Sequence, residues 1–254
     1  MRATRLLVDR PDFTVRAVAC RDDHARWSPP EPVPEFGVVL VRSGGFRRRG
    51  RGGEVLADRT MGYATSPGDE EHFAHPYGGD ECTSIRLGAD LWQGTAGPIY
   101  VDARLDLAHR LLWRAAHGDD PDFAVAERLV QLLDSAPDRA ADGGDRTAVE
   151  RAREAIRAGH PEARGLVPLA RLVGVSPYRL SRAFHAVVGA PLTRYRNRVR
   201  VGAALDRLEQ GETSLAALAF DLGFADQAHL TRTVRAHLGH TPRELQRLLA
   251  GVRV

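Results

Sequence analysis

The chain has 254 residues, of which 43% are hydrophobic, enough for two domains with modest cores. No apolar run approaches the roughly 18 residues that a membrane span needs. The N-terminal segment also lacks the apolar stretch of a secretory signal. Cys20 and Cys82 are too few cysteines for a disulfide framework. We therefore expect a cytoplasmic protein that has no membrane partner.

Charge is divided unevenly between the two halves of the chain. Residues 147–254 hold 17 Arg against 9 acidic residues, a net charge of +8, whereas residues 1–146 have a net charge of −5. A basic C-terminal half beside an acidic N-terminal half is typical of a nucleic-acid-binding domain attached to another domain.

Residues 1–100 predict a small antiparallel β-barrel. Short β-like runs alternate with turn signals rich in Gly and Pro, among them Ser43-Gly44-Gly45. The runs are Phe13–Cys20, Phe36–Arg42, Val55–Ala57, Met61–Thr65 and Cys82–Leu87.

Two amphipathic helices are predicted after these strands, over residues 103–117 and 122–134. Residues 135–146 contain Pro, two Gly and three Asp, which indicates a linker. The predicted domains are therefore 1–134 and 147–254, and from Thr147 onward the pattern is helical almost to the end of the chain.

The C-terminal region contains an internal repeat, over Leu166–Gly189 and Leu215–Gly239. Each copy begins Leu-x-x-Leu-Ala and has a Gly four residues after the Ala, where a first helix must stop and turn. Ser176 and Asp226 then predict the N-caps of second helices at about 177–188 and 227–238.

The outward faces of these second helices match in register. Short polar side chains and Arg, without acidic residues, suit a helix that lies in a DNA major groove. The matched positions are Tyr178, Ser181, Arg182 and His185 in the first helix, and Ala228, Thr231, Arg232 and Arg235 in the second.

Leu192–Glu209 predicts a connecting helix about 27 Å long, close to the roughly 34 Å of one turn of B-DNA. Such a connector can hold two recognition helices on one face of the duplex. Its arginines, which include Arg194 and Arg198, are placed to reach phosphates.

From about residue 148 to 250 the sequence resembles the AraC/XylS family of bacterial transcription regulators. The resemblance rests on short motifs at fixed spacing along the chain, including Gly174-Val175-Ser176, Gly223-Phe224-x-Asp226 and Thr241-Pro242. Leu230, Val234 and Leu245 depart from the aromatic residues usual in the family, and we expect them to be aliphatic replacements in the core.

The resemblance implies seven helices that carry two helix-turn-helix motifs, and it implies contacts to double-stranded DNA. The implied base-contacting residues are Tyr178, Ser181, Arg182, Gln227, Ala228, His229 and Arg232. The residues expected at the DNA backbone are Arg179, His185, Arg194, Arg198, Thr231 and Arg235.

Family members often join this domain to an N-terminal cupin-like barrel that binds an effector, followed by helices that dimerise. We therefore predict an α+β protein that is a ligand-responsive, homodimeric transcription factor. Its effector is an unidentified small molecule, with Arg47, His72 and His75 as candidate contacts. The family also implies contact with RNA polymerase and favours activation of transcription.

Three features of the N-terminal half leave alternatives open. His72, His75 and Cys82, with His24 or Glu70, are potential metal ligands, but their spacing fits no standard zinc pattern, and we predict no metal or other cofactor. The arginines that follow Gly44-Gly45 form either a solvated hairpin or an anion-binding lip. Cys20 and Cys82 form a redox pair only if the fold brings them together.

Neither a nucleophile elbow, a phosphate-binding glycine loop nor an HExxH motif occurs, so we expect no enzymatic activity. Two alternatives to a ligand-responsive regulator stay open. One is a metal-dependent cupin enzyme fused to a DNA-binding domain, and the other is a constitutive DNA binder that needs no effector.

Overall fold

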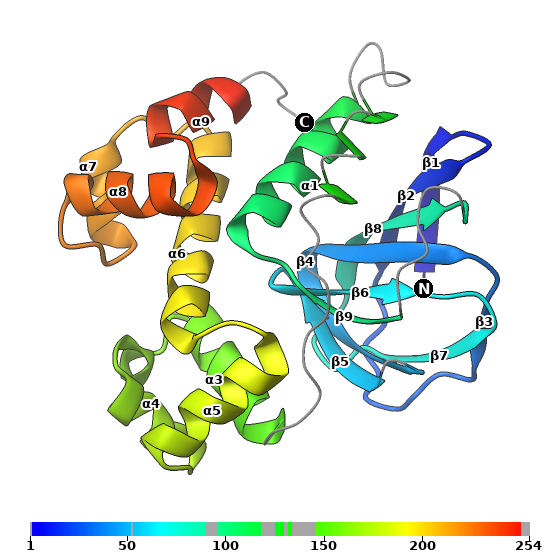
Figure 1. The fold of residues 1–254 in the computed structure, drawn as a ribbon, viewed down its shortest axis with the longest axis horizontal. Helices are drawn as coiled ribbons and strands as arrows, with labels where there is room; N and C mark the ends of the chain where they lie inside the picture. The colour runs from blue at the N-terminus through cyan, green and yellow to red at the C-terminus, as the bar shows by residue number, and fades with distance from the viewer. Residues whose placement is uncertain are drawn as a thin grey trace. The chain divides into compact units, whose positions relative to one another are not determined.

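The computed structural model describes residues 2–51, 53–89, 96–117, 125–126, 128–129, 132–133 and 146–249 (Figure 1). The chain divides into two compact units. The first comprises Met1–Val101 and Ala108–Ala140, and the second comprises Asp102–Leu107 and Ala141–Val254. The predicted linker lies outside the described residues except for Arg146, so its conformation stays a prediction.

The first unit is built on an antiparallel sheet whose main path runs β1-β2-β8-β4-β5-β6-β9. Two further strands lie off this path, because β7 pairs with β4 and β3 pairs with β7. The bounds are β1 Arg2–Asp9, β2 Phe13–Cys20, β3 Glu31–Val33, β4 Phe36–Gly50, β5 Gly53–Asp58, β6 Met61–Thr65, β7 Asp69–Ala74, β8 Asp80–Leu87 and β9 Gly97–Tyr100.

The sheet curls but does not close into a barrel, because the edge strands β1 and β9 do not pair with each other in the described part of the chain. The α+β class with an antiparallel N-terminal sheet is confirmed. Alternate residues of the central strands face inward, so Val38, Leu40 and Ile85 are completely buried.

β4 passes through the point at which the sequence predicts a turn. Ser43-Gly44-Gly45 lies inside this strand, and the register with β8 shifts between Val41 and Ser43. Gly44 has a φ of 71°, and a Cβ there would lie 2.2 Å from the carbonyl oxygen of Gly79. Glycine therefore permits a bulge with close strand contact, and the predicted turn is wrong.

One of the two predicted N-terminal helices is fully described, as α1 (Ala103–Ala115). For the segment 122–134, the structure describes residues 125–126, 128–129 and 132–133, which are helical, and the rest lies outside the description. Val125, Leu129 and Leu132 are buried. Leu129 and Leu132 belong to the apolar face that the sequence predicts here, whereas Val125 lies outside it, and Ala126 and Leu133, which the predicted face includes, are only half-buried.

The described residues of the second unit from Arg146 onward form seven α-helices, the number that the resemblance implies. These are α3 Arg146–Arg157, α4 Leu166–Val173, α5 Pro177–Val188, α6 Leu192–Glu209, α7 Leu215–Asp221, α8 Gln227–Leu238 and α9 Pro242–Leu249, with a short 3₁₀ turn at Pro161–Arg164. α6, the predicted connector, runs between a cluster of α3, α4 and α5 and a cluster of α7, α8 and α9 (Figure 1).

Each cluster of the second unit has its own apolar core against α6. Phe184 and Tyr195 are both fully buried and make an edge-to-face ring contact in the first cluster. Leu218 and Leu230 are fully buried in the second. Among the helices that the structure describes, none is long and apolar enough to cross a membrane.

Candidate functional site

The first repeat folds as two helices joined by a sharp turn. α4 ends at Gly174, whose φ of 80° is left-handed and whose N–H donates to the carbonyl groups of Ala170 and Arg171. α5 then begins after Ser176, whose hydroxyl accepts a hydrogen bond from the Arg179 N–H at 3.2 Å. The predicted stop and cap are confirmed, and together they fix the direction in which α5 leaves the turn.

α5 presents a polar face to solvent and an apolar face to the core. Tyr178 is 71% exposed, and Ser181, Arg182 and His185 are exposed beside it. An Arg182 Nη1 donates to the Tyr178 hydroxyl at 3.2 Å, so two of the predicted base-contacting side chains meet across one turn. Their exposure leaves this pair accessible to a DNA groove.

The apolar spacing of the sequence predicts Leu180, Phe184 and Val187 on the buried face of α5. Leu180 and Phe184 are fully buried, but Val187 is only half-buried, and Val188 occupies the core position.

The second repeat folds in the same way. The chain turns after α7 at Gly223, which has a φ of 68°, and the Asp226 carboxylate then accepts from the His229 N–H at 2.6 Å. The outer face of α8 is mostly exposed. It carries Gln227, Ala228, Arg232 and Arg235 as exposed residues, with Thr231 half-buried.

His229, also predicted to contact bases, is only half-exposed. Its Nδ1 accepts a hydrogen bond from the Ala225 N–H at 3.2 Å, and its ring packs edge-on against Phe224. The imidazole is thus tied to the turn that begins α8, and its Nε2 is the ring nitrogen left for an outside partner.

The arginines of α6 differ from one another in accessibility. Arg194 is 62% exposed, whereas Arg198 is 3% exposed and lies 3.2 Å from the Asp106 carboxylate in the same compact unit. The predicted phosphate contact of Arg198 would require this buried pair to separate. Arg200 has a structural contact of its own, because its Nε donates to the Leu222 carbonyl at 2.9 Å and its guanidinium stacks on Phe224.

The three aliphatic departures from the family pattern are core residues. Leu230 and Leu245 are fully buried and Val234 is 1% exposed. The expectation that these are core replacements is confirmed.

Two capped helix-turn-helix units on one connecting helix define a DNA-binding domain of a transcription regulator. Residues 169–248 match the family model described as a helix-turn-helix domain. No curated protein matches the chain in sequence.

Solved structures of AraC-type regulators resemble the chain. A transcriptional regulator with an AraC-type DNA-binding domain from Chromobacterium violaceum is 27% identical, with a TM-score of 0.39, and the match covers 42% of this chain and 96% of that one. The C-terminal domain of AraT from Geobacillus stearothermophilus is 24% identical, with a TM-score of 0.37, covering 39% and 84% of the two chains.

ToxT from Vibrio cholerae, in a structure with bound unsaturated fatty acid, matches along most of the chain. The two chains are 9% identical with a TM-score of 0.39, and the match covers 97% of this chain and 99% of ToxT.

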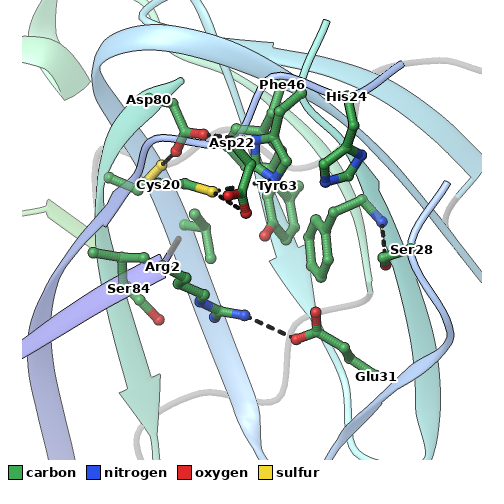
Figure 2. A pocket seen from close by; sticks show the side chains of 15 residues that line it. Arg2, Cys20, Asp22, His24, Ser28, Glu31, Phe46, Tyr63, Asp80 and Ser84 are labelled. Atoms are coloured by element: carbon green, nitrogen blue, oxygen red, sulfur yellow. Dashed lines mark hydrogen bonds and ion pairs between the residues drawn. The ribbon is translucent and has the colours of Figure 1, made fainter. Parts of the chain in front are cut away.

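The first unit encloses a cavity of about 200 Å³ on one face of the sheet (Figure 2). Phe46, Tyr63 and Phe73 supply much of its apolar lining, and Arg2 and Glu31, 2.8 Å apart, pair across part of its wall. A partly apolar hollow with a few polar groups is the usual form of a small-molecule site.

Of the three residues predicted to contact an effector, only His75 lines the described cavity. The Arg47 guanidinium pairs with Glu54 and lies over the Trp27 ring. His72 Nδ1 is 3.0 Å from the Ser28 carbonyl oxygen.

In the arginine run after Gly44-Gly45, Arg47, Arg48 and Arg49 lie in strand β4, and Arg51 lies in the turn that joins β4 to its partner β5. Arg48 is fully buried, with its guanidinium 2.8 Å from Glu71 and 3.7 Å from Asp69. Arg51 is 75% exposed and lies 3.7 Å from the same Asp69. The carboxylates offset much of the positive charge of the run, which argues against an anion-binding lip centred on Arg48.

Polar and sulfur-bearing side chains gather at one end of the cavity. Cys20 is the last residue of β2, and Asp80 and Cys82 lie on β8. His75 comes directly after β7 and forms an isolated backbone β-bridge with His24. Ligand atoms of Cys20, His75 and Asp80 all lie within 4.8 Å of one another. The sequence pointed to His75 and Cys82 but missed Cys20, which is 55 residues away from His75 and approaches it only through strand pairing.

Cys82 takes a different role from the one its spacing suggested. Its thiol donates to Asp80 Oδ2 at 2.9 Å. Burial raises the pKa of this thiol well above its ordinary value, and the Asp80 carboxylate raises it further. Cys82 is therefore held as a protonated thiol.

Proposed function

We propose that this chain is a sequence-specific transcription regulator that inserts α5 and α8 into adjacent major-groove segments of its operator. The observation that carries the proposal is the pair of matched, solvent-exposed faces, each of which follows a capped helix-turn-helix turn. Direct reading of bases requires such side chains to be free of the protein core.

The two recognition helices are unequal in what they offer a base edge. α5 presents Tyr178, Ser181 and Arg182, and all three are exposed. α8 presents Gln227 and Arg232 around Ala228, which offers only a methyl group, and His229 is partly occupied by its contact with Ala225. We expect α5 to supply the larger share of sequence discrimination.

Control by a small molecule is supported by the cavity of the first unit. An effector that fills it would contact the aromatic residues Phe46, Tyr63 and Phe73 and reach His75. A ligand that binds the folded state stabilises it in proportion to the logarithm of its concentration. A thermal-shift screen of the full chain therefore separates a ligand-responsive regulator, which is stabilised by at least one compound, from a constitutive DNA binder, which is not.

Dimerisation, contact with RNA polymerase, the direction of regulation and the lack of enzymatic activity stay predictions. Genomic mapping of bound sites tests the proposed function as a whole. We expect enrichment at a small set of promoters that share one sequence motif. Bound DNA fragments spread evenly over the genome, with no shared sequence motif, would contradict the proposal.

A further inference from the structure

We infer that Cys20, Asp22 and His75 form a binding site for a zinc ion at the end of the N-terminal cavity, with Asp80 positioning the histidine. The site deepens the proposed function because it lies in the cavity assigned to the effector. Its residues differ from the set that the sequence suggested, which contained Cys82 and His72 and lacked Cys20.

The spacing of ligand atoms around the Cys20 sulfur suits a tetrahedral zinc site. Cys20 Sγ lies 3.6 Å from His75 Nε2 and 3.3 Å from Asp22 Oδ2. Zinc bonds of about 2.3 Å to sulfur and about 2.0–2.1 Å to nitrogen or oxygen, at tetrahedral angles, place neighbouring ligand atoms about 3.5 Å apart. At these two distances the Cys20 sulfur can share a zinc ion with His75 and with Asp22.

His75 is oriented by a second interaction on the other side of its ring. Its Nδ1 lies 2.9 Å from Asp80 Oδ1, and an ionised carboxylate can only accept, so Nδ1 carries the proton and Nε2 offers its lone pair toward Cys20. A carboxylate behind a metal-binding histidine is the usual means of fixing both the tautomer and the ring orientation.

Both oxygens of Asp80 are already engaged, one by His75 and the other by the Cys82 thiol. Asp80 is for this reason a positioning residue rather than a ligand. Its hold on Cys82 also keeps that second thiol out of the ligand set. Figure 2 shows Cys20, Asp22 and Asp80 at the same end of the cavity.

The backbone around the site is tightly constrained. Gly79 has a φ of 107°, and a Cβ there would lie 2.5 Å from the Cys20 carbonyl oxygen. Glycine at this position lets the turn before β8 approach the end of β2. This close approach brings Asp80 and Cys20 to the same end of the cavity.

The local charges favour a bound cation. The Asp22 carboxylate lies beside the Cys20 thiol and the Asp80 carboxylate beside the His75 ring, and both negative charges attract a positive ion. Zinc would replace the thiol proton, which passes to solvent as the thiolate–metal bond forms. Three protein ligands leave a fourth position for water or for a donor atom of a cavity ligand.

Cobalt(II) is the probe for this site, because it replaces zinc and reports thiolate ligation through a sulfur-to-metal charge-transfer band. The full chain is freed of metal with a chelator and titrated with Co²⁺. We expect one Co²⁺ per chain, the visible bands of four-coordinate cobalt, the charge-transfer band, and displacement by Zn²⁺.

Matched variants identify the ligands. Cys20→Ser should abolish the charge-transfer band, whereas Cys82→Ser, which removes the neighbouring buried thiol, should keep it. His75→Gln should weaken Co²⁺ binding at least tenfold, and Asp80→Asn should weaken it about 10–100-fold while keeping the band. His72→Gln should bind Co²⁺ like the parent chain, and circular dichroism of each variant verifies folding.

No charge-transfer band in the parent chain at stoichiometric Co²⁺ would overturn the inference, and so would a band that depends on Cys82 instead of Cys20. DNA affinity measured on the same samples separates this inference from the proposed function. A chain that binds operator DNA but no metal overturns the zinc site alone. A chain that binds metal but shows no preference for any DNA sequence overturns the proposed function alone.

Discussion

Arg182 reaches back across one turn of α5 to donate a hydrogen bond to the Tyr178 hydroxyl at 3.2 Å, and both side chains face solvent. The contact holds the guanidinium over the outer face of the helix without burying it. An arginine presented in this way can donate two parallel hydrogen bonds to a guanine edge.

Arg182→Ala should weaken binding to the preferred operator by about 1–3 kcal/mol and relax the base preference at one or two positions. Arg235→Ala is the matched comparison on α8, where we expect a phosphate contact. This variant should weaken binding to all DNA sequences alike. The number of counterions released on binding, measured from the salt dependence of the affinity, should fall by about one. Fluorescence anisotropy with specific and scrambled duplexes measures both effects, and equal losses on the two duplexes for Arg182→Ala would rule out base reading by this residue.

Arg198 should act on stability more than on DNA. Because it is buried beside Asp106, Arg198→Ala leaves a buried carboxylate without this partner and should lower the free energy of unfolding by about 3–5 kcal/mol. Arg194→Ala on the same helix removes a side chain that is 62% exposed and should cost less than about 1 kcal/mol. Urea denaturation compares the two, and similar small losses would show that the Arg198–Asp106 pair is not formed in solution.

The Asp226 cap should matter for the stability of the second helix-turn-helix. Its carboxylate satisfies the His229 N–H, so Asp226→Ala should lower the free energy of unfolding by about 0.5–2 kcal/mol. Ser181→Ala, on the exposed face of α5, should change stability by no more than about 0.5 kcal/mol. Thermal unfolding gives both values, and an Asp226→Ala variant as stable as the parent would contradict the observed cap.

His237 should make the stability of the second unit depend on pH. Burial lowers the pKa of this imidazole, and the Arg194 guanidinium lowers it further. The folded chain then binds the proton more weakly than the unfolded chain. The stabilising contribution is complete above the unfolded pKa of 6.5 and is lost as the pH falls through the folded pKa.

His237→Gln should therefore flatten the decline in melting temperature between about pH 7 and pH 5. His240→Gln, at an exposed position nearby, is the control and should leave the decline as it is. A decline of the same size in all three proteins would assign the pH dependence to other groups.

The helical region could be predicted closely because its signals are local. Glycine stops, Ser176 and Asp226 caps and apolar spacing all act within a few residues, and the connector Leu192–Glu209 was predicted with its observed bounds. Arg198 shows the limit of such reasoning. Its position on α6 suggested a phosphate contact, but its burial depends on Asp106, 92 residues earlier in the chain.

The N-terminal sheet was less predictable because its strands pair over long distances. Gly44 reads as a turn residue in sequence, yet the close approach of Gly79 makes it a bulge within a long strand. The proximity of Cys20 and His75 has the same origin. Sequence spacing pointed to His75 with Cys82, whereas the pairing of β2 with β8 adds Cys20 to the group.

The most direct test of the central claim is chemical footprinting of the full chain on a high-affinity operator. Two reading helices on one connector predict two protected major-groove segments, about one helical turn apart, on the same face of the duplex. Arg182→Ala should reduce the protection in only one of these segments, the one that α5 contacts. A single protected segment, or binding that shows no preference over scrambled DNA, would contradict the account.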